Sequence, residues 1–216
     1  MKEVVKIAMI VVVLTNIVVI ISSMLLGFFA LKKYVEVPYN YEHTLYWGLS
    51  FILLSGSFLI RDLATLFDIS FHHRVLMQVN FTFGLVWWLN SYAVMLATRN
   101  ARGGKTKPYR IGLWVVLVLV LPTVSMVNVP VLYQLLHVSL GLVTVFFLLP
   151  VRKSRPYLIG VYGVLITSEF CSLLSEIEYL KITPVLIDIE RGTLTVGILY
   201  LLWYVYGLVK HKSYVD

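Results

Sequence analysis

Long runs of apolar residues, separated by short polar segments, dominate the chain. A helix needs about 20 mostly apolar residues to cross a bilayer, and seven runs meet or approach that length. Residues 111–151 hold no Asp, Glu, Lys or Arg, and the turn-forming stretch from Pro122 to Pro130 divides them into two helices. The pattern predicts helices over residues 7–31, 44–66, 75–98, 109–126, 131–149, 156–180 and 193–209.

The predicted fold class is therefore an all-α integral membrane protein with seven transmembrane helices, in which residues 1–216 form a single membrane domain. The runs do not alternate as the strands of a membrane barrel do. Composition agrees, since 59% of the residues are hydrophobic and 13% are charged. Soluble domains hold about 45–50% apolar and about 25% charged residues. The composition excludes a soluble enzyme, a disordered chain and a DNA-binding module.

Lys and Arg are distributed unevenly between the two sides of this arrangement. The segments after the first, third and fifth helices and the C-terminal tail carry 12 of them, and the opposite side carries 5. Cytoplasmic loops collect Lys and Arg, so the N-terminus is predicted outside and the C-terminus in the cytoplasm. This distribution explains the net charge of +7, and no nucleic-acid partner is expected.

An internal repeat is predicted from two matching segments. Residues 28–39 match residues 146–157 at five of twelve positions, including a Phe-Phe pair and a Pro-Tyr pair. We interpret this as a 3+1+3 plan: repeat unit 7–98, a linker helix 109–126 and a parallel repeat unit 131–210. The alternative is chance matching among leucine-rich helices.

The 3+1+3 plan resembles that of the SWEET sugar transporters and their PQ-loop relatives in length, orientation and topology. The resemblance implies a transport site between the two units, as in other parallel-repeat transporters. Those families carry a proline within the first and fifth helices. Here the first helix has none, and the fifth has prolines only at its ends, Pro130 and Pro150.

Ionisable residues inside a membrane mark function by default. Most of the polar ones here fall in the outer half, which predicts a polar pocket open to the outside. Adjacent residues on a helix point about 100° apart, so Arg61 and Asp62 are each expected to pair with another helix, Arg61 with Glu169 and Asp62 with His137. The alternative is a set of structural ties between helices. The predicted ligand or ion pocket comprises Glu169, Arg61, Asp62, His137, Asn16 and Asn90.

Aromatic residues of the third and seventh helices form a second candidate group. Trp88, Trp203 and Tyr206 are interpreted as a possible pocket lining, with packing between helices as the alternative. The acidic segment 176–191 is predicted to be an outer loop. It could close over the pocket, bind a partner or rest at the membrane interface.

No cofactor, metal or catalytic site is predicted. Retinal needs a lysine midway along the last helix, and Lys210 stands at its end. Haem would need two facing histidines, and only His137 lies well inside the membrane. HExxH, GxSxG and Walker motifs are absent from the sequence, so an enzyme is not expected.

We therefore expect a multi-pass protein of the cell membrane that binds or senses a small molecule and acts through a cytoplasmic signalling partner. One alternative is a small-solute or ion transporter with its site between the repeats. The other is a structural subunit of a larger membrane complex, in which the intramembrane charges pair with another membrane subunit.

Overall fold

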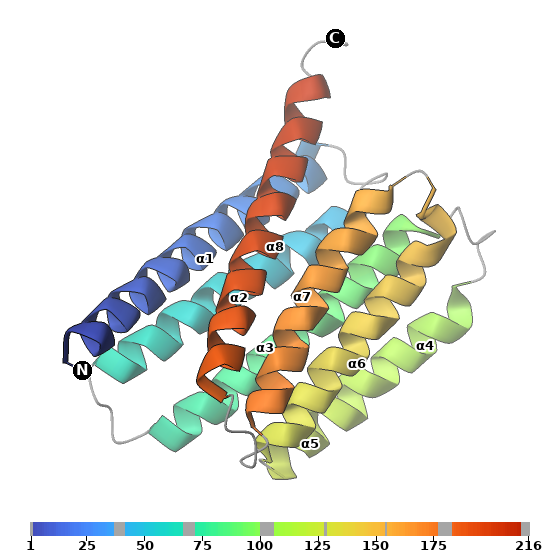
Figure 1. Cartoon of the computed structure of the whole chain (residues 1–216). Helices are drawn as coiled ribbons and strands as arrows, with labels where there is room; N and C mark the ends of the chain where they lie inside the picture. Colours follow the sequence, from blue (N-terminus) through green and yellow to red (C-terminus); the bar gives the residue numbers. More distant parts are fainter. Residues whose placement is uncertain are drawn as a thin grey trace.

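The computed structural model describes residues 2–36, 42–66, 72–99, 106–127, 129–153, 155–176 and 183–212, and these residues form helices joined by short turns without any strand. Seven long helical rods result (Figure 1). Their helices are α1 (Lys2–Glu36), α2 (Glu42–Leu66), α3 (His72–Ala97), α4 (Lys107–Val115), α5 (Leu121–Val127), α6 (Pro130–Leu148), α7 (Pro156–Ser175) and α8 (Thr183–Lys212).

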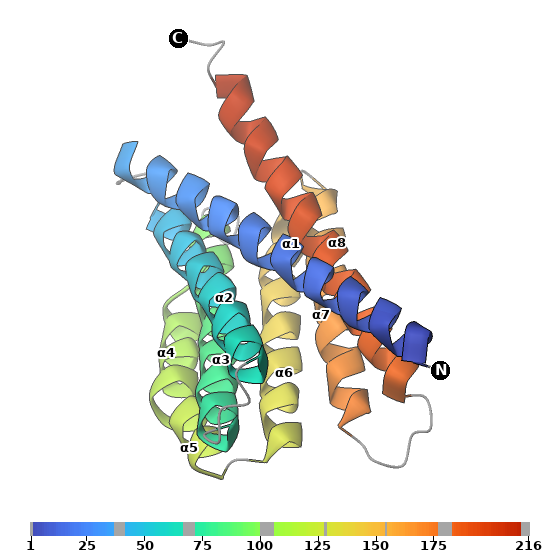
Figure 2. The ribbon, with the colours of Figure 1, turned by 90° about the vertical axis from the view of Figure 1, so that its left-hand side faces the viewer.

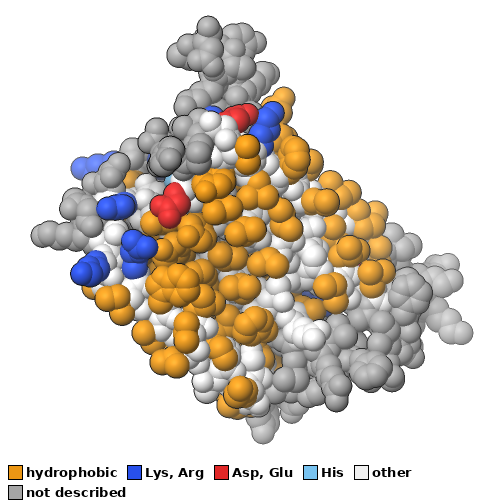
Figure 3. All heavy atoms as spheres, turned by 180° about the vertical axis from the view of Figure 1, so that it is seen from behind, with side chains coloured by type: hydrophobic (Ala, Val, Ile, Leu, Met, Phe, Trp, Pro, Cys, Tyr) orange, Lys and Arg blue, Asp and Glu red, His pale blue; other side chains and the backbone are white. Residues whose placement is uncertain are grey.

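Five of these rods are long and apolar enough to cross a membrane, which supports the predicted class of all-helical membrane protein. The five segments are Val13–Glu36, Glu42–Leu63, Lys107–Val127, Pro130–Val151 and Pro156–Ser175. Large apolar side chains such as Ile21, Met24 and Phe28 are exposed on the outside of the bundle. Figure 3 shows a broad face covered by apolar side chains, with Lys and Arg gathered mainly along one edge. Such a surface is suited to lipid rather than to water.

Six helices close into a ring. α1 packs on α2 and α8, α2 packs on α3, α3 on α6, α6 on α7, and α7 on α8. The rod of α4 and α5 lies outside this ring, mainly against α3 (Figures 1 and 2). The ring therefore consists of the three helices before this rod and the three helices after it.

Helix α3 is the most enclosed helix of the bundle. Residues 86–95 are all buried, because α2, α6 and the α4–α5 rod cover different sides of the helix. Ser91 lies 2.8 Å from the Thr144 hydroxyl and donates to the carbonyl of Leu140 at 3.0 Å. These small polar residues allow α3 and α6 to approach closely and tie them together.

The rod of α4 and α5 contains a π-helical segment, Val116–Val120. Pro122 follows two residues later and has no N–H to donate to the carbonyl of Val118. A wider turn is one way in which a helix accommodates such a gap in its hydrogen bonds. The rod continues to Val127, so the break between the fourth and fifth rods falls directly before Pro130.

The predicted outer loop over residues 176–191 was wrong in its second half. Helix α8 begins at Thr183, ten residues before the predicted start at Thr193. Pro184 stands in the first turn, where proline suits a helix, and the charged residues that follow do not oppose helix formation. Helix α7 ends at Ser175, and its predicted continuation to Leu180 lies outside the described residues.

The crossing of α1 and α2 depends on two glycines. A Cβ atom on Gly27 would lie 2.7 Å from Cγ1 of Ile52 and 3.0 Å from the carbonyl oxygen of Gly48. A Cβ atom on Gly48 would lie 2.6 Å from Cγ of Leu31. Any larger residue at either glycine must therefore displace the facing side chain or the facing helix.

We expect Gly27→Val to destabilise the protein by about 1–3 kcal/mol, the usual cost of overpacking. The measurement is unfolding of the purified protein in detergent. Gly160→Val is the matched control, because a Cβ atom there meets nothing within 4 Å. Equal stability of the two variants would contradict the close packing at Gly27.

Candidate functional site

A cavity of about 220 Å³ lies inside the ring, and α2, α3, α6, α7 and α8 all contribute to its walls. On α3 the lining extends from Val79 to Asn90, which corresponds to about 16 Å along the helix. The cavity is therefore elongated along the bundle. Its polar lining residues are Arg61, Asn80, Trp87, Asn90, Gln134, His137, Tyr162, Ser168, Glu169, Ser172, Glu176 and Glu190.

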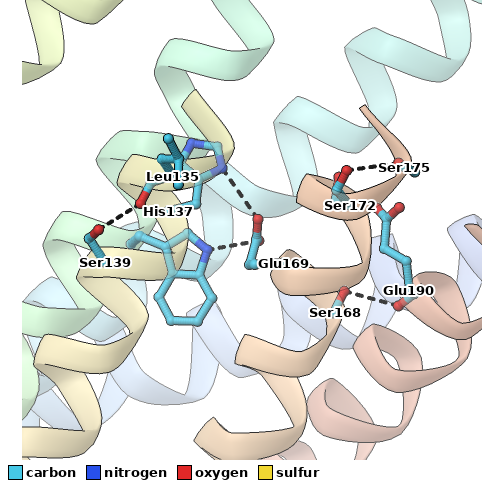
Figure 4. Close-up of polar contacts among 9 residues, drawn as sticks. Leu135, His137, Ser139, Ser168, Glu169, Ser172, Ser175 and Glu190 are labelled. Atoms are coloured by element: carbon cyan, nitrogen blue, oxygen red, sulfur yellow. Dashed lines mark hydrogen bonds and ion pairs between the residues drawn. The ribbon is translucent and has the colours of Figure 1, made fainter. Parts of the chain in front are cut away.

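The carboxylate of Glu169 lies in the middle of this lining. The indole Nε1 of Trp87 donates to Oε1 of Glu169 at 2.8 Å. On the other side, Nδ1 of His137 lies 3.3 Å from Oε2 (Figure 4). The side chains of Glu169 and His137 are only 14% and 3% exposed. Three helices, α3, α6 and α7, thus hold one largely buried carboxylate between them.

Two further hydrogen bonds connect helices at the end of the cavity near Asn90. Asn90 donates to the hydroxyl of Ser50 on α2 at 3.0 Å. The buried hydroxyl of Tyr162 on α7 donates to Oδ1 of Asn90, also at 3.0 Å. Asn90 therefore ties α2, α3 and α7 together below the Glu169 carboxylate.

Charged residues gather at the other end. A second hollow, also of about 220 Å³, shares Arg61, Glu176 and Glu190 with the first. Helix α8 contributes Glu190 to this end because the helix begins at Thr183, before the predicted start. Ser168 of α7 donates to the carbonyl oxygen of Glu190 at 2.9 Å (Figure 4). The end of the cavity that adjoins the second hollow therefore carries both signs of charge.

The contacts of Arg61 and Asp62 differ from those predicted. Nε of Arg61 lies 3.7 Å from Oδ1 of Asp62, because the long arginine side chain reaches its neighbour despite the angle between them. Asn16 of α1 also donates to Oδ1 of Asp62, at 3.0 Å. His137 contacts Glu169 and not Asp62. Arg61 and Glu169 do line the same cavity.

Asn16 lines only the second hollow, and Asp62 is absent from both linings. The predicted pocket residues that share the main cavity are Arg61, Asn90, His137 and Glu169. The predicted set is thus divided between a central cavity and a hollow beside α1.

The predicted aromatic lining is replaced by a different one. Trp88 is buried between α3 and α4, stacks on Tyr92 and donates to the carbonyl of Leu113. Trp203 and Tyr206 are 68% and 54% exposed on the outside of α8. The aromatic residues that do line the cavity are Phe51, Phe58, Phe83, Trp87 and Tyr162.

Eight of the twelve polar lining residues were not in the predicted pocket, and three of them show why. Glu190 was assigned to a loop, and Trp87 could not be distinguished from Trp88 without knowing which side of α3 faces inward. Gln134 offered a signal, because it stands three residues before His137 and shares its face of the helix.

Among the described residues, no group of three His, Cys, Asp or Glu side chains could hold a metal ion.

The fold and the site together define a helical membrane protein with a polar cavity inside a ring of six helices. Comparison of the chain with protein-family models, with curated proteins and with solved structures finds no match. Its function is therefore argued from the cavity itself.

The bond between Trp87 and Glu169 can be measured by a double-mutant cycle. We expect Trp87→Phe and Glu169→Leu to show a coupling free energy of about 0.5–1.5 kcal/mol, typical of a hydrogen bond between membrane helices. The measurement is the free energy of unfolding of the two single variants and the double variant.

Trp88→Phe combined with Glu169→Leu is the matched control, with expected coupling near zero, since the Trp88 indole donates to Leu113. Equal coupling in the two cycles would contradict the assigned contact.

Proposed function

We propose that the chain is a small-molecule binding and sensing module of the cell membrane, with seven transmembrane helices, the N-terminus outside and the C-terminus in the cytoplasm. The observation that carries this proposal is the cavity, in which a largely buried carboxylate, a histidine and an amide converge between apolar walls. Convergent polar groups in a mostly apolar hollow are typical of small-molecule sites.

The positive-inside rule supports entry of the ligand from outside. The cavity mouth near Arg61 and Glu190 lies by the end of α2 and the start of α8. The Lys- and Arg-rich segments of the sequence adjoin the opposite ends of these helices. Under that rule the mouth faces the outside, and the basic segments face the cytoplasm.

Sensing follows from the origin of the cavity walls. Helices α2 and α3 come from the first half of the ring, and α6, α7 and α8 from the second half. A ligand between the halves favours the spacing that fits it best, and thereby shifts their relative positions. The cytoplasmic ends of the helices would transmit this change to a signalling partner that recognises the basic segments.

A panel of small amines, acids, alcohols and sugars, screened by thermal shift on the purified protein, tests binding. Ser172→Phe fills the junction of both hollows, since Ser172 lines each of them. We expect at least one compound to raise the melting temperature of the wild type and not of Ser172→Phe. A ligand at 100 times its Kd stabilises by about 2.7 kcal/mol.

Thr167→Phe is the matched control on the same helix, because Thr167 is exposed and bonded only within α7. It is expected to respond as the wild type does. A panel without any active compound, or identical shifts in Ser172→Phe, would contradict a ligand site in the cavity.

Transport is the second candidate, and the order of helices in the ring favours it. When two parallel three-helix units are related by a two-fold axis and form one ring, the third helix of each unit packs against the first helix of the other unit. The α3–α6 and α8–α1 contacts meet this requirement. This order supports the 3+1+3 repeat, with the cavity between the two units, where parallel-repeat transporters place their site.

Transport predicts that a compound found to bind also enters liposomes containing the wild-type protein, and that Glu169→Gln abolishes its uptake. The control is again Thr167→Phe, which should transport normally. Binding without uptake by the wild type would exclude transport of that compound and leave sensing.

A further inference from the structure

Two acceptor atoms in the cavity have no hydrogen-bond partner among the described residues. They are Nε2 of His137 and Oε1 of Gln134, and both atoms are buried. The two residues lie three positions apart on α6, which places them on one face of that helix, and both line the cavity. A buried polar atom without a partner is costly, so a ligand whose head reaches these atoms by displacing the side chains around them relieves that cost.

The Glu169 carboxylate determines whether a ligand at these atoms must donate or accept hydrogen bonds. A carboxylate only accepts, so the proton on His137 is placed on Nδ1, which lies 3.3 Å from Oε2. In a neutral imidazole Nε2 is then an acceptor, as Oε1 of Gln134 always is. The ligand must therefore bring donors.

The charges of the lining favour a cation. Three glutamates line the cavity, Glu169, Glu176 and Glu190, against Arg61 as the single Lys or Arg in the described lining. Arg61 belongs to the mouth, where its guanidinium lies 4.4 Å from the centre of the Phe58 ring and beside Asp62. Between low-dielectric walls such an excess of negative charge attracts cations.

The walls favour an organic cation over a bare metal ion. Phe58 and Phe83 meet edge to face with their centroids 5.4 Å apart, and Phe83 lies 6.4 Å from the His137 ring. Aromatic faces attract cationic groups and apolar bodies alike. An apolar cavity of about 150 Å³ holds a benzene ring, so about 220 Å³ can hold a single ring with a short polar group.

We propose that the cavity binds a small organic cation whose head carries N–H donors and whose body is a short apolar or aromatic group. The head binds the Glu169 carboxylate beside His137 and Gln134, and the body lies against Phe58 and Phe83. This inference rests on the proposed binding function and adds the chemical class of the ligand.

Four probes with the same ring separate the contributions: benzylammonium, benzyltrimethylammonium, benzyl alcohol and benzoate. Binding to the wild-type protein in nanodiscs is measured by calorimetry. We expect benzylammonium to bind at least about tenfold more tightly than benzyltrimethylammonium, which lacks N–H donors, and than neutral benzyl alcohol. Benzoate should bind least. Displacement of benzylammonium by equimolar K⁺ or Na⁺ would overturn the organic class.

Variants locate the head group. Glu169→Gln should lower the affinity for benzylammonium by about tenfold or more. The affinity for benzyl alcohol should change little. Gln134→Leu should reduce the preference for benzylammonium over benzyltrimethylammonium. Ser139→Ala on the same helix is the control, because Ser139 is exposed and donates to Leu135 within α6 (Figure 4). Unchanged affinities in both cavity variants would overturn the assigned head position.

The outcomes separate this inference from the proposed function. If benzoate or benzyl alcohol binds as tightly as benzylammonium or more tightly, the cationic class is overturned and the proposed binding function remains. The same holds if the four probes fail while another compound binds the wild type and not Ser172→Phe. If no compound of any class binds the cavity, both the class and the binding function are overturned.

Discussion

The cost of leaving a polar group without a partner among apolar helices is the constraint on which this structure depends. Helix α3 is enclosed on several sides, and its polar residues reach different neighbours. Asn90 bonds α2 and α7, Ser91 bonds α6, and the indole of Trp87 bonds the carboxylate of α7. Each contact offsets the desolvation cost of a polar group. Together the contacts determine which helices pack against α3 and how α3 is rotated about its own axis.

The cavity differs from the helix contacts of α3 in how its polar groups are paired. Ser91 and Asn90 have partners, whereas Nε2 of His137 and Oε1 of Gln134 have none among the described residues. The unpaired atoms belong to residues that line a hollow, and the Glu169 carboxylate lines the same hollow. Polar groups that serve only to hold helices together would be expected to contact one another.

The elements were well predicted by the sequence, and their contacts were not. Apolar length predicted the helical rods within a few residues at most ends, since a bilayer requires about 20 apolar residues of any sequence. The start of α8 was missed because Asp188 and Glu190 resemble a loop in an apolar count, although glutamate favours a helix and aspartate costs it little. Glu169 and His137 line one cavity and contact each other, whereas the sequence predicted another partner for each.

The sequence by itself determined the class of the protein, because composition and apolar length depend on no partner. It also determined which polar residues are unusual for a membrane helix. Only the tertiary structure decided which of Trp87 and Trp88 faces the cavity, and that His137 meets Glu169. The physical reason is rotation: a turn of about 100° about the helix axis separates adjacent residues, and only contacts with other helices determine which of them points inward.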